Sequence, residues 1–102
     1  MIQTVMIAKS RHARKRQAQR GITDLQMSLA LDYGRRVHGT GAELVFLGRQ
    51  DIPEWIHPRY ADRMNGTVVI LSPGGTVLTT YRDPGALLRL RKRAKLPRRP
   101  RV

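Results

Sequence analysis

Apolar residues repeat at helical spacing in the first third of the chain. The repeat consists of Ile22, Leu25, Leu29 and Tyr33. Within its first turn, Thr23 and Gln26 have the spacing of a capping box, in which the two side chains cap backbone N–H groups at the start of a helix. We therefore expect an amphipathic α-helix that begins after Thr23 and ends near Gly34.

An earlier helix is predicted over residues 11–20. Ser10 can cap its start, and Gly21 can end it in the left-handed conformation that glycine adopts easily. The apolar residues in and next to this helix are only Ala8, Ala13 and Ala18. We therefore expect the helix to lie close against its support without burying a wide face. A short strand or an extended arm is predicted before it by Ile2, Val5 and Ile7.

Runs of apolar and β-branched residues predict three strands after residue 40. They cover residues 42–47, 67–72 and 77–82, and Pro73-Gly74-Gly75 between the last two is typical of a tight turn. Two helices followed by antiparallel strands predict an α+β fold. We expect two N-terminal helices packed on a three- to four-stranded antiparallel sheet, with a basic C-terminal helix or tail.

A long connection, residues 48–66, separates the first predicted strand from the second. It contains two prolines, and a helical turn is predicted around residues 60–64. An Asp-Pro pair after the last strand can start a third helix that runs into a basic segment and ends at Pro97. We expect one α+β domain over residues 1–88 and a basic C-terminal extension, residues 89–102.

The composition excludes several classes of protein. The chain has 102 residues and no cysteine, so we expect one small domain without disulfides, thiolate zinc sites or a cysteine nucleophile. The longest apolar runs are four residues, far below the roughly 20 that a membrane helix needs. The start of the chain also lacks the charge order of a signal peptide. We therefore expect a soluble cytoplasmic protein.

The net charge of +13 is concentrated in two segments. Residues 9–20 hold six basic residues and no acid, and residues 89–101 hold eight basic residues and no acid. Separated basic segments predict a polyanionic partner, most commonly nucleic acid. An anionic membrane is not expected because neither segment has a wide apolar face. An acidic protein partner is the remaining alternative.

Three residues of the first predicted helix combine proton transfer with positive charge. His12, Arg16 and Arg20 follow one another at intervals of four residues, which places them in one stripe along a helix. Histidine can move protons near neutral pH, and guanidinium groups bind phosphate and stabilise negative charge on it. Metal-free cleavage of RNA needs this set, because the 2′-hydroxyl of the substrate is the nucleophile. A solvated basic helix with an incidental histidine is the alternative.

The last predicted strand contributes hydroxyl groups to the same hypothesis. Alternation along a strand predicts Val77, Thr79 and Tyr81 on one face of the sheet. The hydroxyls of Thr79 and Tyr81 can orient a phosphate or act as weak proton donors, although core packing also explains both residues. Further phosphate contacts are predicted at Arg11, Lys15, Arg82, Arg89, Arg91, Lys92, Arg93 and Lys95.

The other histidines and the aromatic residues give weaker signals. His38 is expected at a strand edge, and His57 lies in the long connection. Together with His12 they lack the spacing of metal ligands, so neither a metal nor another cofactor is predicted. Trp55 and Tyr60 either stack on a base or a partner, or fix the connection to the domain.

Three motifs of the chain occur together in one order. They are His12-Ala13-x-x-Arg16, Gln19-Arg20-Gly21-Ile22-Thr23 and Leu78-Thr79-Thr80-Tyr81-Arg82. This set resembles a family of small bacterial and phage proteins that is grouped with the RelE/ParE-like toxins and with the barnase, EndoU and colicin-type ribonucleases. The resemblance implies N-terminal helices on a four-stranded antiparallel sheet and metal-independent cleavage of RNA. It also implies roles in cleavage for His12, Arg16, Arg20, Thr79 and Tyr81.

Our leading hypothesis is an RNA-directed, metal-independent ribonuclease-like protein that acts as the toxin of a toxin-antitoxin or phage-defence pair. An acidic antitoxin or the ribosome would then be a partner. The first alternative is a nucleic-acid-binding module without catalysis. The second is a ParE-like protein that inhibits a protein target. The long connection and the basic tail depart from the pattern of the family, and activity does not follow from fold alone.

Overall fold

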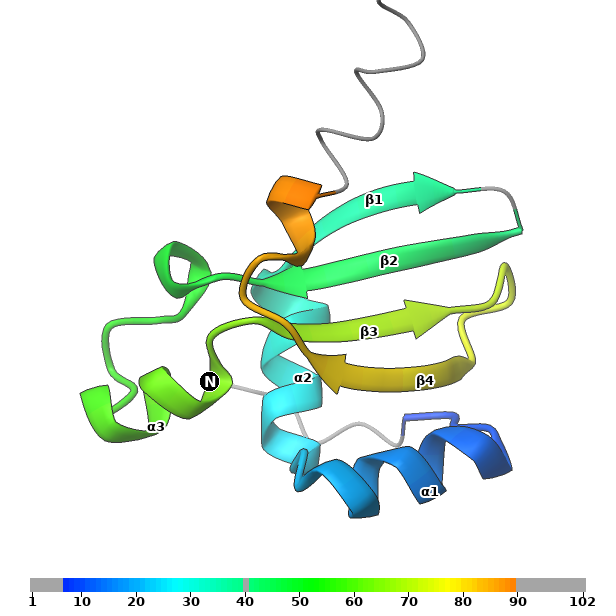
Figure 1. Cartoon of the computed structure of the whole chain (residues 1–102), viewed down its shortest axis with the longest axis horizontal. Helices are drawn as coiled ribbons and strands as arrows, with labels where there is room; N and C mark the ends of the chain where they lie inside the picture. The colour runs from blue at the N-terminus through cyan, green and yellow to red at the C-terminus, as the bar shows by residue number, and fades with distance from the viewer. Residues whose placement is uncertain (1–6, 40, 90–102) are drawn as a thin grey trace, which may run out of the picture.

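Four strands form one antiparallel sheet in chain order, β1-β2-β3-β4, in the computed structural model of the chain (Figure 1). The structure describes residues 7–39 and 41–89. Two helices precede the sheet, which confirms the predicted α+β class and its order of elements. A short 3-10 turn also lies between β2 and α3. The bounds are α1 (Arg11–Arg20), α2 (Asp24–Tyr33), β1 (Arg35–Gly39), β2 (Ala42–Leu47), α3 (Pro58–Met64), β3 (Thr67–Leu71) and β4 (Val77–Arg82).

Both N-terminal helices begin and end at the predicted residues. The Ser10 hydroxyl accepts the N–H of Ala13 at 3.0 Å, and Gly21 ends α1 with a φ of 64°. At the start of α2, the Thr23 hydroxyl accepts the N–H of Gln26 at 3.0 Å. The Gln26 side chain accepts the N–H of Thr23 at 3.1 Å in return, which completes the capping box. Local hydrogen bonds therefore set these helix bounds.

The buried side of α2 differs from the predicted apolar repeat. Leu25 and Tyr33 are 46% and 43% exposed, although Leu29 is buried as expected. Gln26 is buried instead, because its Nε2 donates to the hydroxyl of buried Thr67 at 3.2 Å. A buried amide costs little when its hydrogen bonds are made. The helix can therefore turn a polar residue inward and leave Leu25 at the surface.

Strand β1 and the length of α3 were not predicted. β1 contains one apolar residue, Val37, and forms by pairing along its whole length with β2. His38 lies in this edge strand, as expected. Helix α3 begins at Pro58, earlier than the predicted helical turn, and His57 caps it by accepting the N–H of Arg59 on Nδ1 at 3.1 Å. Proline suits the first helical position because its missing N–H would have no partner there.

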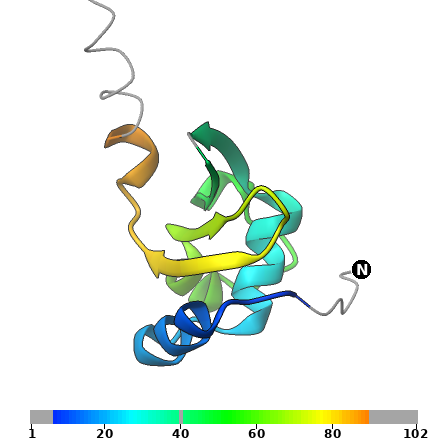
Figure 2. The ribbon, with the colours of Figure 1, turned by 90° about the vertical axis from the view of Figure 1, so that its right-hand side faces the viewer.

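The two faces of the sheet pack against different segments. On one face, which we call the α2 face, the main core lies between the sheet and α2 (Figure 2). The opposite face carries a smaller apolar cluster around Phe46 and Val68, against which Ala86 and Leu87 pack. The residues that the sheet contributes to the α2 face of the core are Val45, Leu47, Val69, Leu71 and Val77.

A β-bulge in β4 changes which residues share a face. The register pairs Leu71 with Val77 and Ile70 with Thr79, so Leu78 has no partner in β3. Val77 therefore lies on the α2 face, whereas Tyr81 packs on the opposite face. The prediction that Val77 shares a face with Thr79 and Tyr81 is wrong, because the bulge shifts the alternation by one residue.

The chain turns into a further helix after β4. Residues 86–89 are helical, and Asp83 accepts the N–H of Gly85 at 3.1 Å just before them. Arg89 pairs with Asp83, which holds the pKa of that carboxyl group below its usual range and raises the pKa of Arg89. The predicted end of this helix at Pro97 and the basic extension beyond Arg89 lie outside the described residues. No helix within the described ranges is long and apolar enough to cross a membrane.

Replacing Gly66 with alanine tests a close backbone contact at the start of β3. Gly66 has a φ of +90°, and a Cβ there would lie 2.5 Å from the backbone nitrogen of Pro84. We expect Gly66→Ala to lower the free energy of unfolding by about 2–4 kcal/mol in urea denaturation. Gly75→Ala is the control, since its φ is +91° with nothing within 4 Å, and it should cost about 1 kcal/mol. Equal losses would contradict the importance of the Pro84 contact.

Candidate nucleic-acid interface

Helix α1 runs beside the outer edge of β4 (Figure 2), and residues at its two ends donate hydrogen bonds to three carbonyls of that strand. At its start, Ser10 donates from its N–H to the carbonyl of Val77 at 2.9 Å and from its hydroxyl to the carbonyl of Leu78 at 3.2 Å. At its end, Arg20 Nη1 donates to the carbonyl of Thr80 at 3.0 Å. An open strand edge would be a template for pairing with another chain. Helix α1 therefore covers the β4 edge of the sheet, and the same hydrogen bonds hold the helix in place.

Polar contacts with α2 set the rotation of α1 about its own axis. Lys9 Nζ pairs with Asp24 at 2.6 Å, and the Gln17 side chain donates to the same carboxylate at 2.6 Å. The Lys9 ammonium, and after it the Gln17 amide, hold the pKa of Asp24 below its usual range. Ala13, which lies one turn before Gln17, is fully buried. The side of α1 that carries Ala13 and Gln17 thus faces the core and α2.

His12, Arg16 and Arg20 lie on a different side of the helix, which we call the basic flank. His12 and Arg16 each precede by one position a residue that faces inward, so they are turned about 100° from the core. Arg16 Nε lies 3.4 Å from His12 Nε2, and Arg16 Nη1 donates to Gln19 at 2.9 Å. The contact with His12 is long and therefore weak. In this contact Nε2 of His12 is the acceptor.

Arg20 joins the basic flank to β4. Its guanidinium carbon lies 6.0 Å from the centre of the Tyr81 ring, which is within reach of a cation-π interaction. Thr79 and Tyr81 are half-buried on the face of the sheet opposite α2. The adjacent Thr80 is buried on the other face and donates its hydroxyl to the carbonyl of Val68 at 2.8 Å. The hydroxyl of Thr80 is therefore committed to the sheet.

The structure thus forms two contacts among the five residues predicted to act in cleavage. One joins His12 to Arg16, and the other joins Arg20 to Tyr81. Within the described part of the chain, no hydrogen bond links Thr79 to either pair. The helix places the two arginines one turn apart on the same flank. His12, Arg16 and Arg20 thus lie along one side of α1, as predicted, and Arg20 contacts β4.

The other predicted phosphate contacts fall into four groups. Arg11 and Lys15 are exposed on α1. Arg82 instead holds the end of α3, since it donates to the carbonyls of Asp62 at 2.8 Å and Asn65 at 2.9 Å. Arg89 is exposed but paired with an aspartate. Four others lie outside the described residues: Arg91, Lys92, Arg93 and Lys95.

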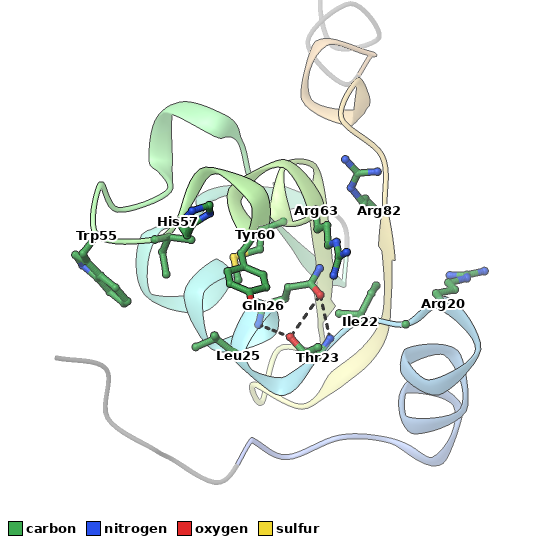
Figure 3. A pocket seen from close by; sticks show the side chains of 13 residues that line it. Arg20, Ile22, Thr23, Leu25, Gln26, Trp55, His57, Tyr60, Arg63 and Arg82 are labelled. Carbon is green, nitrogen blue, oxygen red and sulfur yellow. Dashed lines mark hydrogen bonds between the residues drawn. The ribbon is translucent and has the colours of Figure 1, made fainter.

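A pocket of about 750 Å³ opens between the start of α2 and the connection that leads into α3 (Figure 3). Its apolar lining consists of Ile22, Leu25, Ile56 and Met64. Three arginines also line it, Arg20, Arg63 and Arg82. Since Arg20 belongs to both regions, the pocket adjoins the basic flank. We call it the Trp55 pocket after its most exposed aromatic side chain.

Two aromatic side chains stand at the pocket with much of their surface free. Trp55 is 60% exposed and Tyr60 is 53% exposed. The rings of Tyr60 and His57 meet edge to face, with centroids 6.2 Å apart. Over half of Trp55 and of Tyr60 is open to solvent, so contacts with the domain do not use most of either side chain. Their free surface is available to a ligand.

Sequence reasoning found only part of this pocket. Trp55 and Tyr60 were candidates because aromatic residues in a long connection are few. Leu25 was assigned to the core, and nothing in the pattern marked Arg63 or Ile56. The capping box at Thr23 was predicted, but the burial of Gln26 against Thr67, which leaves Leu25 beside the connection, was not.

Comparisons with models of protein families, with curated proteins and with solved structures found no match. The resemblance to RelE/ParE-like toxins therefore stays a prediction. Among the described residues, no group of three or more His, Asp and Glu side chains could hold a metal ion. Fold and site define the chain as an α+β domain with a basic helix along one sheet edge and an apolar pocket lined by arginines beside it.

Asp24→Asn tests the contact that sets the rotation of α1. Because the pKa of Asp24 is lowered in the folded chain, its charge stabilises the fold above the ordinary carboxyl pKa of about 4, and this stability is lost as the pH falls through the lowered value. Asp24 is mostly exposed, so we expect a loss of at most about 1 kcal/mol at neutral pH. Urea unfolding of both proteins from neutral to acid pH measures it. A difference in the free energy of unfolding between the two proteins that is just as large in strong acid would contradict this role.

Proposed function

We propose that the protein binds RNA along the basic flank and cleaves it without a metal ion. The observation that supports this most is the position of Arg20, which is anchored to the Thr80 carbonyl and lies over the Tyr81 ring. It directs the remaining guanidinium nitrogens to the surface between helix and strand, one turn from Arg16 and two from His12. A phosphate bound there would meet two cations and a group that can move protons.

The proposed reaction uses the substrate's own 2′-hydroxyl as nucleophile. His12 Nε2 accepts the hydroxyl proton while the 2′-oxygen bonds to phosphorus and the bond from phosphorus to the 5′-oxygen breaks. The imidazolium then returns the proton to the leaving 5′-oxygen, so the products are a 2′,3′-cyclic phosphate and a 5′-hydroxyl. Arg16 and Arg20 would stabilise charge on the phosphoryl oxygens. Arg16 can leave His12 at little cost, because their contact is long.

The hydroxyls of Thr79 and Tyr81 would form the other wall of this site. Both residues lie half-buried on the face of the sheet next to the Arg20 guanidinium. In this proposal they orient the phosphate, and Tyr81 also holds Arg20 through its ring. A toxin of a toxin-antitoxin or phage-defence pair would use such an activity, and an acidic antitoxin or the ribosome would be its partner.

A binding module without catalysis is the second candidate, and one observation favours it. Among the described residues, His12 forms a side-chain hydrogen bond only with Arg16. Histidines that act as bases are commonly oriented by a third group, such as a carboxylate. None of the described residues gives His12 such a partner. In this alternative the basic flank neutralises phosphates and cleaves nothing.

His12→Ala distinguishes the two candidates. We expect the native protein to cleave single-stranded RNA in EDTA and to leave 2′,3′-cyclic ends, and the variant to lose at least about 100-fold in rate while keeping its affinity. The measurements are product analysis on denaturing gels and binding by fluorescence anisotropy. His38→Ala is the control, since His38 is exposed on β1 and 85% of its side chain is accessible.

Two results would count against the cleavage proposal. RNA that stays intact with native protein, both alone and with ribosomes present, would support the binding module. Equal rates for His12→Ala and the native protein would remove His12 from the reaction. Loss of both binding and folding in the variant is not expected, because His12 is exposed and belongs to no core contact.

A further inference from the structure

The Trp55 pocket combines flat apolar surfaces with positive charge. Trp55 and Tyr60 expose more than half of their surface, and Leu25 beside them is 46% exposed. The pocket lining contains three arginines and no acidic residue. Within the described residues, the guanidinium of Arg63 forms neither a hydrogen bond nor an ion pair. A ligand that matches this lining has a flat apolar part and a negative charge close to it.

Two polar side chains of the lining, those of Thr23 and Gln26, are already committed to the fold. Thr23 and Gln26 bond to each other in the capping box, and the amide nitrogen of Gln26 donates to Thr67. The acceptor nitrogen of His57 is occupied by the N–H of Arg59. These three groups are therefore not free to read the hydrogen-bonding edge of a base, whereas His57 Nε2 and the Tyr60 hydroxyl have no hydrogen-bond partner among the described residues. The exposed rings and the guanidinium of Arg63 offer stacking and attraction to phosphate, which tolerate any base.

Arg20 makes the pocket continuous with the basic flank. The same side chain lines the pocket and extends the row that begins at His12. A strand of phosphates that follows α1 would reach the mouth of the pocket at Arg20. A peptide with a few carboxylates would match the pocket but would leave the cations of α1 without partners. The continuity favours a polyanion with unpaired bases over an acidic protein.

We propose that the Trp55 pocket holds one unpaired nucleotide of single-stranded RNA. The base stacks on Trp55 and Tyr60, and Arg63 and Arg20 contact the phosphates on either side of it. This inference rests on the proposed function in one respect, that the basic flank binds RNA. A pocket of about 750 Å³ is within the usual range for small ligands. Stacking on these two rings implies selectivity for single strands over duplexes.

Trp55 gives a direct test, because it is the only tryptophan of the chain. The probe is a short 2′-O-methyl oligoadenylate, which lacks the nucleophilic hydroxyl and so cannot be cleaved by the proposed reaction. We expect Trp55 fluorescence to change in step with binding, which is followed separately by the anisotropy of a dye on the oligonucleotide. The same oligonucleotide annealed to its complement should leave the fluorescence unchanged, since its bases are paired.

Two pairs of variants identify the contacts. Tyr60→Ala should weaken binding about 5- to 100-fold, as loss of one stacked base does, while Tyr33→Ala, exposed at the other end of α2, should not. Arg63→Ala should weaken binding and reduce the slope of log affinity against log salt by about 0.7. Its control is Arg59→Ala, on the same helix but outside the pocket lining.

The outcomes separate this inference from the proposed cleavage. Trp55 fluorescence that does not change at saturating oligonucleotide would overturn the pocket proposal, whether or not the protein cleaves RNA. A fluorescence response from a protein that cleaves nothing would support the pocket and contradict the cleavage. A response to a polyglutamate peptide but not to the oligonucleotide would assign the pocket to an acidic protein and overturn the inference.

Discussion

The covered edge of β4 is the constraint on which the rest of the arrangement depends. An edge strand leaves a row of backbone groups unpaired, and here Ser10 and Arg20 donate to three of its carbonyls. Apolar burial alone cannot hold α1, because Ala13 is its only buried residue. Hydrogen bonds from Ser10 and Arg20 to β4 carbonyls fix its two ends. A nearly uniformly polar helix can therefore lie firmly on the domain with its basic flank in solvent.

Strand β4 positions both walls of the candidate interface. On one side it anchors Arg20, and through it the end of the basic flank. On the other side Arg82 donates to two carbonyls at the end of α3, and α3 carries Tyr60 and Arg63 into the Trp55 pocket. Two regions far apart in the chain thus meet at one strand. Their juxtaposition is what makes a continuous path for a nucleic-acid strand physically reasonable.

The sequence predicted most of the elements but only part of the site. Caps and turn residues are local, so both N-terminal helices and strands β2 and β4 have the predicted bounds. β1 was missed because its stability comes from pairing with β2 and not from its own apolar pattern. The bulge at Leu78 was missed for a similar reason, since it depends on the register with β3. The Trp55 pocket depends on the buried amide of Gln26, which no periodicity indicates.

Our central claim is that one strand of RNA contacts the basic flank and the Trp55 pocket at the same time, with Arg20 between them. Chemical-shift mapping by NMR with the uncleavable oligoadenylate tests this most directly. We predict that the perturbed backbone and side-chain signals form one continuous surface over residues 12–23, 55–63 and 79–82. Perturbations confined to residues 89–102, with the signals of His12, Arg20 and Trp55 unchanged at saturation, would contradict the account.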